Sequence, residues 1–466
     1  MRVTTGVTES TAAATAVGTA LTAAEIAEQV REGSLSVRDA VEDALARIAR
    51  HDAVLGAFAS VRADAALREA DQVQDRVGSG EHLPLAGVPV AVKDNVAITG
   101  EVMRAGSRAS GHEPQRHDHA VVARLRAAGA VVVGMTTMPE AGLWLTTDGD
   151  RITRNPWNIE FSASGSSGGA AAAVASGMVP IAHGNDGLGS LRQPAAACGL
   201  LGIKPSHGLV PSGVGINDWY GLVDNGPLAR TASDLALMLS VMAGDPSLAE
   251  IRQPPRSLQV AVSVRTPVQG THTHPAITKE VFAAAGLLGA HGHQVARDQP
   301  GYPKRLSLAG TFRWFASATD YVESVPEPDL LEPRTLGHAS AGRRVRRLIR
   351  HEQMAEWRSR VETFFDRFDL LMTPVTATHP LRAERWSDRA WATNVRANVT
   401  ASGGFCGMWN VAGFPAISIP FGVDPVTGTP VGIQLAAPHG SDALLLSMAG
   451  FFEKWQPWPA LAPRWQ

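Results

Sequence analysis

The sequence has few cysteines, no long uninterrupted apolar run and no excess of one charge. Cys198 and Cys406 are the only cysteines among 466 residues, and without a CxxC spacing they predict neither a disulfide framework nor a zinc site. The most apolar stretch, residues 168–182, is broken by serine, glycine and proline and does not predict a membrane span. A net charge of -2 argues against binding to nucleic acid or to an anionic membrane surface. A small neutral ligand is the expected partner.

The N-terminal stretch is rich in threonine and alanine. Residues 1–20 carry one arginine and no continuous apolar segment, so they lack the charged and hydrophobic regions of a signal peptide. We therefore expect a flexible tail on a cytoplasmic protein. With 44% hydrophobic and 18% charged residues, residues 21–466 are long enough to bury a large core.

Helix signals begin directly after this tail. Residues 22–50 predict two amphipathic helices: Thr22 and Glu25 form a capping box, Gly33 ends the first helix, and Ser36 begins the second. The serine and threonine side chains can accept hydrogen bonds from the first free backbone amides of each helix.

Strand-like and helix-like segments alternate along the rest of the chain. VPVAVKD (88–94) and AVVVGM (130–135) flank residues 119–129, which have helical spacing. Further strand-like runs are MVPIAHG, LQVAVSV, FDLLMTP, FPAISIPF and PVGIQLAA. This order predicts an α/β fold with a central mixed sheet covered by helices on both faces. Residues 300–400 lack strand periodicity for most of their length and predict a mainly helical insertion, in which RRVRRLIR (343–350) forms a solvated helix face.

Serines and glycines gather in two places. In the first, GSSGG (165–169) fits GxSxG with Ser167 at its centre, which is the pattern of an α/β-hydrolase nucleophile elbow. The preceding NIEFSAS is a poor strand, however, and no later histidine is marked by its local sequence. Alternatively, Ser166 and Ser167 cap the apolar helix that begins near Gly168.

The second place is the turn GNDGLGS (184–190), which follows an apolar run. Glycines allow consecutive backbone amides to converge there, and this is how an oxyanion hole is built. Acyl transfer from an amide also needs a nucleophile and a base. Asp186 in the turn and Arg192 after it are expected to form a structural ion pair.

Taken together, these segments resemble the amidase signature family over nearly the whole chain from about residue 22. The matching segments are GVPVAVKDN, GSSGGAAAAVASG, GNDGLGSLRQPAAACGLLGIKPSHG, VDNGPLARTASDLA, NVAGFPAISIPFG and PVGIQLAAP. The resemblance implies the amidase signature fold and hydrolysis of a carboxylic amide or a related C–N acyl bond through an acyl-enzyme, without a cofactor.

It also implies a Ser-cisSer-Lys triad. Ser190 is in the position of the nucleophile, Ser166 is the bridging serine on a cis peptide after Gly165, and Lys93 is the base at the end of the VPVAV strand. A lysine is a base at neutral pH only when its pKa is depressed, and the apolar run before Lys93 indicates the burial that depresses it.

Backbone amides near Gly187, Leu188 and Gly189 are expected to hold the oxyanion. The chain departs from the family's usual GTDxGGS here, because Leu188 lies where glycine is usual. The asparagine at position 185, in the context AHGND, is similar to the branch that contains nylon-oligomer amidases.

The substrate pocket is expected to be lined by the segment after TTMPE, including Leu143 and Trp144, and by parts of the 300–400 insertion. The tryptophan and phenylalanine content of these segments favours an apolar or aryl acyl group. A position in the core is an equal alternative for Trp144, Trp314 and Trp391. Two other functions remain open, namely an amidase subunit of a tRNA-dependent amidotransferase and a catalytically inactive ligand-binding relative. A homo-oligomer also stays open. HDH (117–119) and HTH (272–274) lack further spaced ligands and are interpreted as solvated loops, so no metal is expected.

Overall fold

The computed structural model describes residues 20–215 and 217–465. The tail expected over residues 1–20 lies outside the described residues except for its last position. Within the described part of the chain, every helix is too short or too polar to cross a membrane.

The described strands form one mixed sheet, which confirms the predicted α/β fold. In spatial order they are β1 (Phe58–Val61), β3 (Val131–Thr136), β2 (Pro89–Lys93), β4 (Ile181–Asp186), β6 (Asp224–Ala229), β5 (Leu201–Lys204), β10 (Ala416–Val423), β11 (Pro430–Ala436), β9 (Leu370–Pro374), β7 (Gln259–Val262) and β8 (Gln294–Arg297). Strand β2 runs parallel to both β3 and β4, and β9, β7 and β8 are also mutually parallel. The strands between these two parallel groups pair antiparallel.

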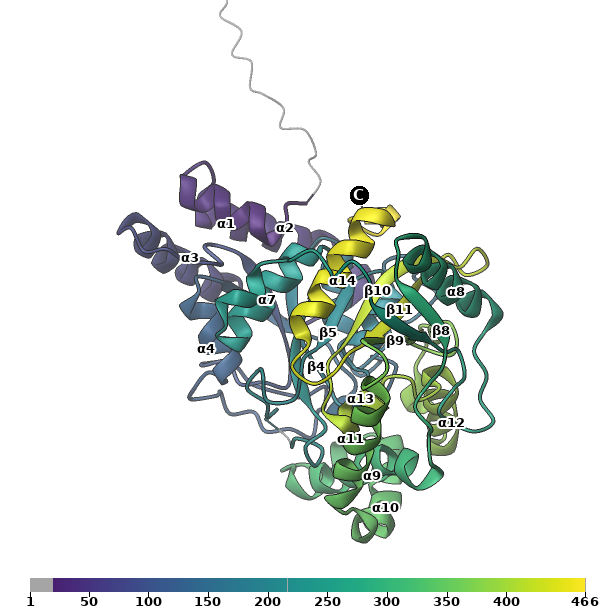
Figure 1. Cartoon of the computed structure of the whole chain (residues 1–466). Helices are drawn as coiled ribbons and strands as arrows, with labels where there is room; N and C mark the ends of the chain where they lie inside the picture. The colour runs from purple at the N-terminus through teal and green to yellow at the C-terminus, as the bar shows by residue number, and fades with distance from the viewer. Residues whose placement is uncertain (1–19, 216, 466) are drawn as a thin grey trace, which may run out of the picture.

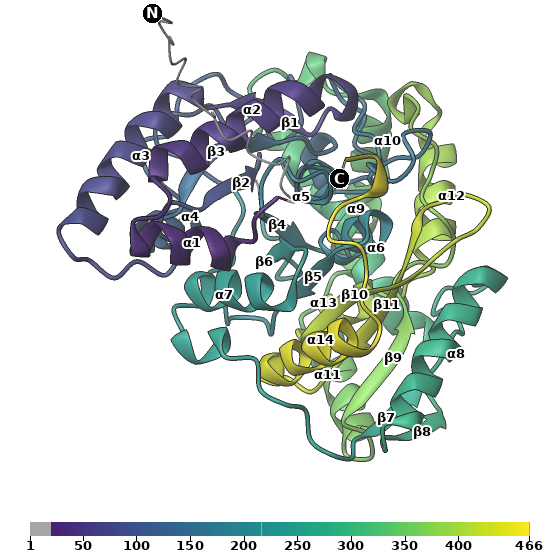
Figure 2. The ribbon, with the colours of Figure 1, turned by 90° about the horizontal axis from the view of Figure 1, so that it is seen from above.

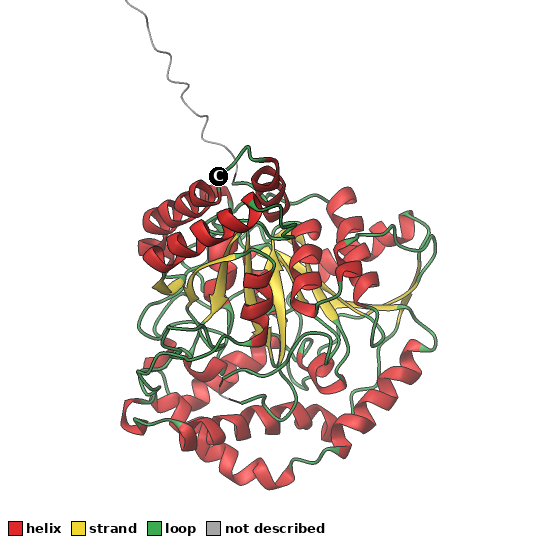
Figure 3. Cartoon of the chain, turned by 90° about the vertical axis from the view of Figure 1, so that its left-hand side faces the viewer, coloured by secondary structure: helices red, strands yellow, loops and turns green. Residues whose placement is uncertain are grey.

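Helices cover both faces of this sheet (Figures 1 and 3). They are α1 (Ala23–Glu32), α2 (Val37–Leu55), α3 (Ala63–Gly78), α4 (Ala120–Ala127), α5 (Gly168–Ala175), α6 (Arg192–Cys198), α7 (Ala232–Ala243), α8 (Pro275–Ala290), α9 (Lys304–Ser324), α10 (Pro333–Val345), α11 (Glu352–Phe365), α12 (Trp391–Ser402), α13 (Gly407–Ala412) and α14 (Asp442–Trp455). Viewed from above, α7 and α14 lie on one side of the row of strands, and α5 and α6 lie on the other (Figure 2).

The first two helices form as their sequence signals predict. Thr22 Oγ1 accepts from the Glu25 amide, the Glu25 carboxylate accepts from the Thr22 amide, and Gly33 ends α1 with a left-handed φ of 76°. Ser36 caps α2 through the Asp39 amide.

Helices α9 to α12 and strand β9 occupy most of the region between residues 300 and 400, and α9, α10 and α11 lie below the sheet in Figure 1. The arginines of the 343–350 run are exposed, as expected, and Arg346 pairs with Asp320 and Glu323 on α9. Aromatic side chains of this region pack together in a second core that also contains Trp144 and Trp409.

Candidate active site

The site begins at the carboxyl ends of β2 and β4. The two strands are parallel neighbours, with Val90 opposite Ile181 and Ala91 opposite Ala182. Lys93 is the last residue of β2, and Asn185 lies one residue before the end of β4. Carboxyl ends of adjacent parallel strands meet at the same edge of a sheet, where ligand sites of α/β proteins gather. The strand order therefore brings these two side chains together.

Lys93 is fully buried and makes two polar contacts. Its Nζ lies 2.7 Å from Ser166 Oγ and 2.8 Å from Asn185 Oδ1. Asn185 Nδ2 in turn donates to Asn95 Oδ1 at 2.7 Å. This pair of asparagines fixes the direction of the lysine amine and was not singled out from the sequence as part of the site. The sequence signal was present, since Asn95 ends the KDN segment and Asn185 departs from the family's threonine.

Burial changes the protonation of Lys93. Loss of water around the ammonium lowers the pKa of Lys93 from 10.5 to about 7, although the nearby Asp186 carboxylate opposes this change. A large fraction of the side chain is therefore neutral at neutral pH, as the apolar strand before it predicts.

Ser166 and Ser190 face one pocket. The Gly165–Ser166 peptide bond is cis, in agreement with the resemblance. The pocket is lined by Asn95, Ala141, Gly142, Ser166, Asn185, Gly187, Ser190, Val214, Trp219 and Val223. Ser190 is partly exposed, and its hydroxyl has no hydrogen-bond partner within residues 20–215 and 217–465. The Ser190 hydroxyl is thus available to a molecule in the pocket.

The turn that carries Ser190 is held by a buried carboxylate. Asp186 Oδ1 accepts from the Gly189 amide at 2.6 Å, and Asp186 Oδ2 accepts from the Leu191 amide at 3.2 Å. The Gly189 amide, included above among the oxyanion donors, is thus already engaged within the protein. No sequence pattern reveals this bond, because it depends on how the Asp186 side chain folds back over its own turn.

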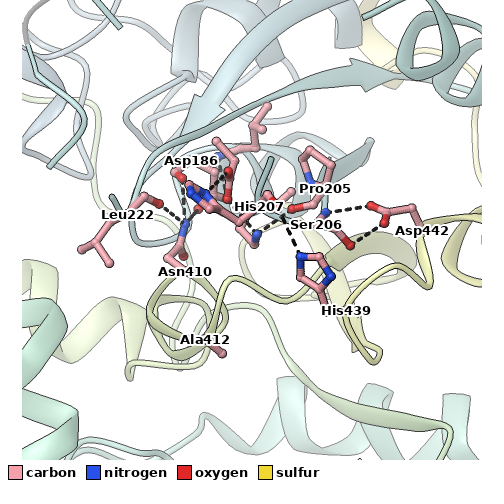
Figure 4. A network of polar contacts seen from close by, with 12 residues as sticks. Asp186, Pro205, Ser206, His207, Leu222, Asn410, Ala412, His439 and Asp442 are labelled. Carbon is pink, nitrogen blue, oxygen red and sulfur yellow. Dashed lines mark hydrogen bonds and ion pairs between the residues drawn. The ribbon is translucent and has the colours of Figure 1, made fainter. Parts of the chain in front are cut away.

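Asp186 is held in turn by a fully buried ion pair with Arg192, 2.8 Å long, as the sequence predicts. Arg192 also donates to Asn410 Oδ1 and Gln434 Oε1, both at 2.8 Å. Asn410 Nδ2 donates to the backbone oxygens of Asp186 and Leu222 (Figure 4). The guanidinium keeps the pKa of Asp186 below its ordinary value despite burial. One charged cluster therefore links the turn that carries Ser190 to β11 and α13.

The amides of Gly187 and Leu188 make no hydrogen bond to the described part of the chain. Gly187 packs against the Trp219 ring, which a Cβ at position 187 would approach to 2.9 Å. The Leu188 side chain lies where Cβ atoms on Gly310 and Gly407 would come within 3.1 and 2.9 Å of its Cδ2. These two glycines make room for a leucine where the family usually has glycine.

The environment of Ser167 argues against a nucleophile elbow. Ser167 is fully buried, and its hydroxyl donates to the Asn185 carbonyl at 3.2 Å. The expectation that it caps α5 is also wrong for the side chain: Ser167 occupies the cap position without a capping hydrogen bond. Its hydroxyl instead joins the start of α5 to β4.

Leu143 and Trp144, expected to bind substrate, are core residues. Both are buried, and neither is among the residues that line the pocket of Ser190. The Leu143 carbonyl accepts from Trp314 Nε1 at 3.0 Å, and the Trp144 ring lies under the Arg334 guanidinium at 5.2 Å. Packing from α9 and α10 covers both side chains, and the pocket wall is formed instead by the preceding Ala141 and Gly142.

The remaining sequence features have local roles. Cys198 and Cys406 are free and fully buried, and burial raises the pKa of both thiols. His119 of the HDH segment begins α4, where its Nδ1 accepts from the Val121 amide. His274 of the HTH segment has neighbours that the sequence did not indicate, and these are described below.

A buried lysine next to a serine hydroxyl, with a second serine on a glycine-rich turn, is the kind of site found in serine hydrolases that use lysine as the base. Comparison with known proteins identifies the family. The amidase family model matches residues 39–446. The chain is therefore a member of the amidase family, and it is an amidohydrolase.

Individual relatives agree with this assignment. The chain is 37% identical over 452 residues to the putative amidase AmiB2 of Mycobacterium tuberculosis, covering 94% of this chain and 96% of that protein. It is 32% identical to an acylamidase of Rhodococcus erythropolis, covering 94% and 96%. A solved structure of 6-aminohexanoate cyclic dimer hydrolase complexed with substrate has a TM-score of 0.85 at 28% identity, covering 96% of this chain and 99% of that one.

Proposed function

We propose that the chain hydrolyses a small carboxylic amide through an acyl-enzyme on Ser190, with Ser166 as proton relay and Lys93 as base. The observation that carries this proposal is the 2.7 Å contact between Lys93 Nζ and Ser166 Oγ, in a pocket that Ser190 also lines. The lowered pKa of Lys93 supports it, because only the neutral amine can accept a proton.

In the acylation step, Ser190 Oγ attacks the amide carbonyl carbon. The Ser190 proton passes to Ser166 Oγ as the Ser166 proton passes to Lys93 Nζ, and the carbonyl oxygen becomes an oxyanion. The tetrahedral intermediate then breaks its C–N bond. The proton returns from Lys93 through Ser166 to the leaving amine, which departs neutral and leaves an ester on Ser190.

Deacylation repeats this path with water. Water attacks the ester carbonyl carbon as its proton passes to Ser166 Oγ and the Ser166 proton passes to Lys93 Nζ. The tetrahedral intermediate then breaks its C–O bond to Ser190, and a proton returns from Lys93 through Ser166 to Ser190 Oγ. The products are the free carboxylic acid and the starting enzyme.

The amides of Gly187 and Leu188, which have no partner among the described residues, are the oxyanion donors in this scheme. Each oxyanion donor typically contributes about 2.7–4 kcal/mol to acyl transfer. The Gly189 amide contributes by holding the turn through Asp186.

The pocket wall favours an apolar or aryl acyl group. Ala141, Val214, Trp219 and Val223 supply apolar side chains, and the polar groups of the pocket are concentrated around Ser166 and Ser190. A pocket of this kind binds a substrate by burying its apolar part and placing one polar group at the reacting atoms. Aryl and alkyl amides are therefore the substrates to test first.

Two serine variants test the proposal by steady-state turnover of such an amide. Ser190→Ala should abolish turnover, because no nucleophile remains, whereas Ser167→Ala should retain much of the wild-type rate, since Ser167 makes only a structural contact. The opposite pattern would restore the nucleophile elbow. Preference for glutamine together with a need for partner chains would indicate the amidotransferase subunit, and inertness across amides, esters and hydrazides would indicate an inactive relative.

A further inference from the structure

A second cluster of polar side chains lies outside the pocket of Ser190. His274 immediately precedes α8, His379 follows β9, and Asp424 follows β10. Each residue offers one ligand atom, and the three atoms all lie within 4.8 Å of one another. The rings of His274 and His379 meet at a centroid distance of 4.4 Å. Three segments that are distant in sequence thus bring two imidazoles and a carboxylate to one point.

Asp424 is oriented toward this point by its own turn. Its Oδ1 accepts from the amides of Val426 and Thr427 at 2.9 and 2.7 Å, and from Thr427 Oγ1 at 3.0 Å. Asp424 is only 2% exposed, and its Oδ2 is buried without a hydrogen-bond partner in the described part of the chain. His379 Nε2 lies 3.5 Å from this oxygen, beyond hydrogen-bond distance for a strong contact. Burying a carboxylate oxygen without a hydrogen bond is unfavourable in free energy, and a bound cation would compensate for it.

We propose that His274, His379 and Asp424 bind a divalent transition-metal ion of the Zn²⁺ type. Two imidazole nitrogens and one carboxylate oxygen are a donor set that zinc takes in proteins, with a water molecule as the fourth ligand. Zinc–ligand bonds of about 2.0–2.2 Å place tetrahedral ligand atoms roughly 3.3–3.6 Å apart. The 3.5 Å between His379 Nε2 and Asp424 Oδ2 already matches that spacing.

His274 needs only a local adjustment to complete the set. It is an exposed residue at the start of α8, and the hydrogen bond from the Ala276 amide to its Nδ1 is long, at 3.3 Å. The ring can therefore change tautomer or rotate when a metal binds, at small cost. The hydrogen bonds that Asp424 Oδ1 accepts already fix the direction of Asp424 Oδ2, as partners of metal-binding carboxylates do.

The metal site is separate from acyl transfer. None of its three residues lines the pocket of Ser190. His379 lines a second cavity of about 500 Å³ together with Ser164 and Gln193. Bound metal would tie the start of α8 to the loops after β9 and β10, and a ligand that binds only the folded chain raises the temperature of unfolding.

The test uses the purified full chain, stripped of metal by chelation and titrated with Zn²⁺ by calorimetry. We expect one ion per chain and a rise in the midpoint of thermal unfolding. His379→Ala and His274→Ala should each weaken Zn²⁺ binding at least tenfold. His272→Ala removes an exposed histidine two residues from His274 and is the matched control. It should leave binding unchanged.

Co²⁺ gives a second readout, because ligation by nitrogen and oxygen in a tetrahedral site produces a visible absorption band that surface binding does not. This band should appear in the wild type and in His272→Ala and be lost in His274→Ala. Because His274 is exposed, its variant is expected to fold. Absence of stoichiometric Zn²⁺ binding, or binding that is equal in all variants, would overturn the proposal.

Discussion

At the scale of single residues, the proposed mechanism depends on one buried lysine, Lys93, which is shielded from water and has two polar neighbours. Ser166 and Asn185 hold the amine of Lys93 in place without adding charge, and Asn95 holds Asn185. A carboxylate in the place of Asn185 would still accept from Lys93 Nζ, although it could not donate to Asn95 Oδ1. It would also change the electrostatics, because an opposite charge within about 4–6 Å favours the ammonium form. Asn185 is thus a positioning residue whose neutrality matters.

Asn185→Asp should move the acid limb of the pH profile of kcat/KM to higher pH. In the proposed mechanism Lys93 acts in its neutral form, so the rate should fall as pH falls through the pKa of Lys93, which is about 7. A neighbouring negative charge raises that pKa, by about 1–3 units. If Asn185→Asp instead lowered kcat/KM by the same factor at every pH, Asn185 would have a purely structural role.

The titration of Asp94 must be distinguished from that of Lys93 in the pH profile, because burial raises the pKa of Asp94 to about 7 as well. Asp94→Asn keeps an oxygen that can accept from the Arg104 amide. The acid limb should remain in this control. Its disappearance there would assign the titration to Asp94 and contradict a lysine base.

At the scale of elements, close packing of small residues positions the site. Helix α5 is made of glycine, alanine and one valine, all buried, and it contacts both β2 and β4. A Cβ at Gly169 would lie 2.4 Å from the Ala57 carbonyl oxygen and 2.4 Å from Thr137 Oγ1. The Ala57 carbonyl belongs to the backbone and cannot rotate away from an added Cβ as a side chain could. Helix α5 can therefore lie this close to the sheet only with glycine at position 169.

Gly169→Ala should therefore lower the free energy of unfolding, by about 1–3 kcal/mol, the usual cost of overpacking. Urea denaturation followed by fluorescence measures the change. Gly286→Ala on α8 is the matched control, because an added Cβ there meets nothing within 4 Å. It should stabilise the chain by about 0.5–1 kcal/mol, since alanine favours a helix over glycine. Equal effects at both positions would refute the packing argument.

At the scale of the whole molecule, a buried charge cluster joins distant parts of the chain at the nucleophile turn. The Arg192 guanidinium donates hydrogen bonds to Asp186, which is near it in the sequence. It also donates to Asn410 and Gln434, which are more than 200 residues away. Folding of the C-terminal strands and formation of the turn are thus coupled through one guanidinium.

Arg192→Met should lower the free energy of unfolding by about 3–5 kcal/mol, because it leaves the Asp186 carboxylate buried without its partner. The control is Arg346→Met, which removes a half-exposed arginine paired with Asp320 and should cost about 0–1 kcal/mol. Urea midpoints of the two variants give the comparison. A small effect at Arg192 would show that the cluster contributes little.

Whether a feature can be predicted from the sequence depends on how far apart in the chain its interacting residues are. The caps at Thr22 and Ser36 are fixed by neighbours within three residues and were predicted correctly. The position of Lys93 at a strand end was also predicted, because strand and turn signals are local. For Trp144 the sequence left a core position and a pocket position equally open, because its burial depends on helices more than 150 residues later in the chain. The cluster of His274, His379 and Asp424 was not predicted, because these residues are distant in the sequence and are brought together only by the fold. From its local sequence alone, His274 was interpreted as a loop residue.

The most direct test of the proposed Lys93–Ser166–Ser190 mechanism is to identify which serine reacts with a covalent probe. The chain is treated with a fluorophosphonate probe, weighed intact by mass spectrometry, and digested to locate the adduct. We expect a single adduct on Ser190 in the wild type and in Ser167→Ala, and no adduct in Ser190→Ala. An adduct on Ser167, or full labelling of Ser190→Ala, would contradict the proposed mechanism.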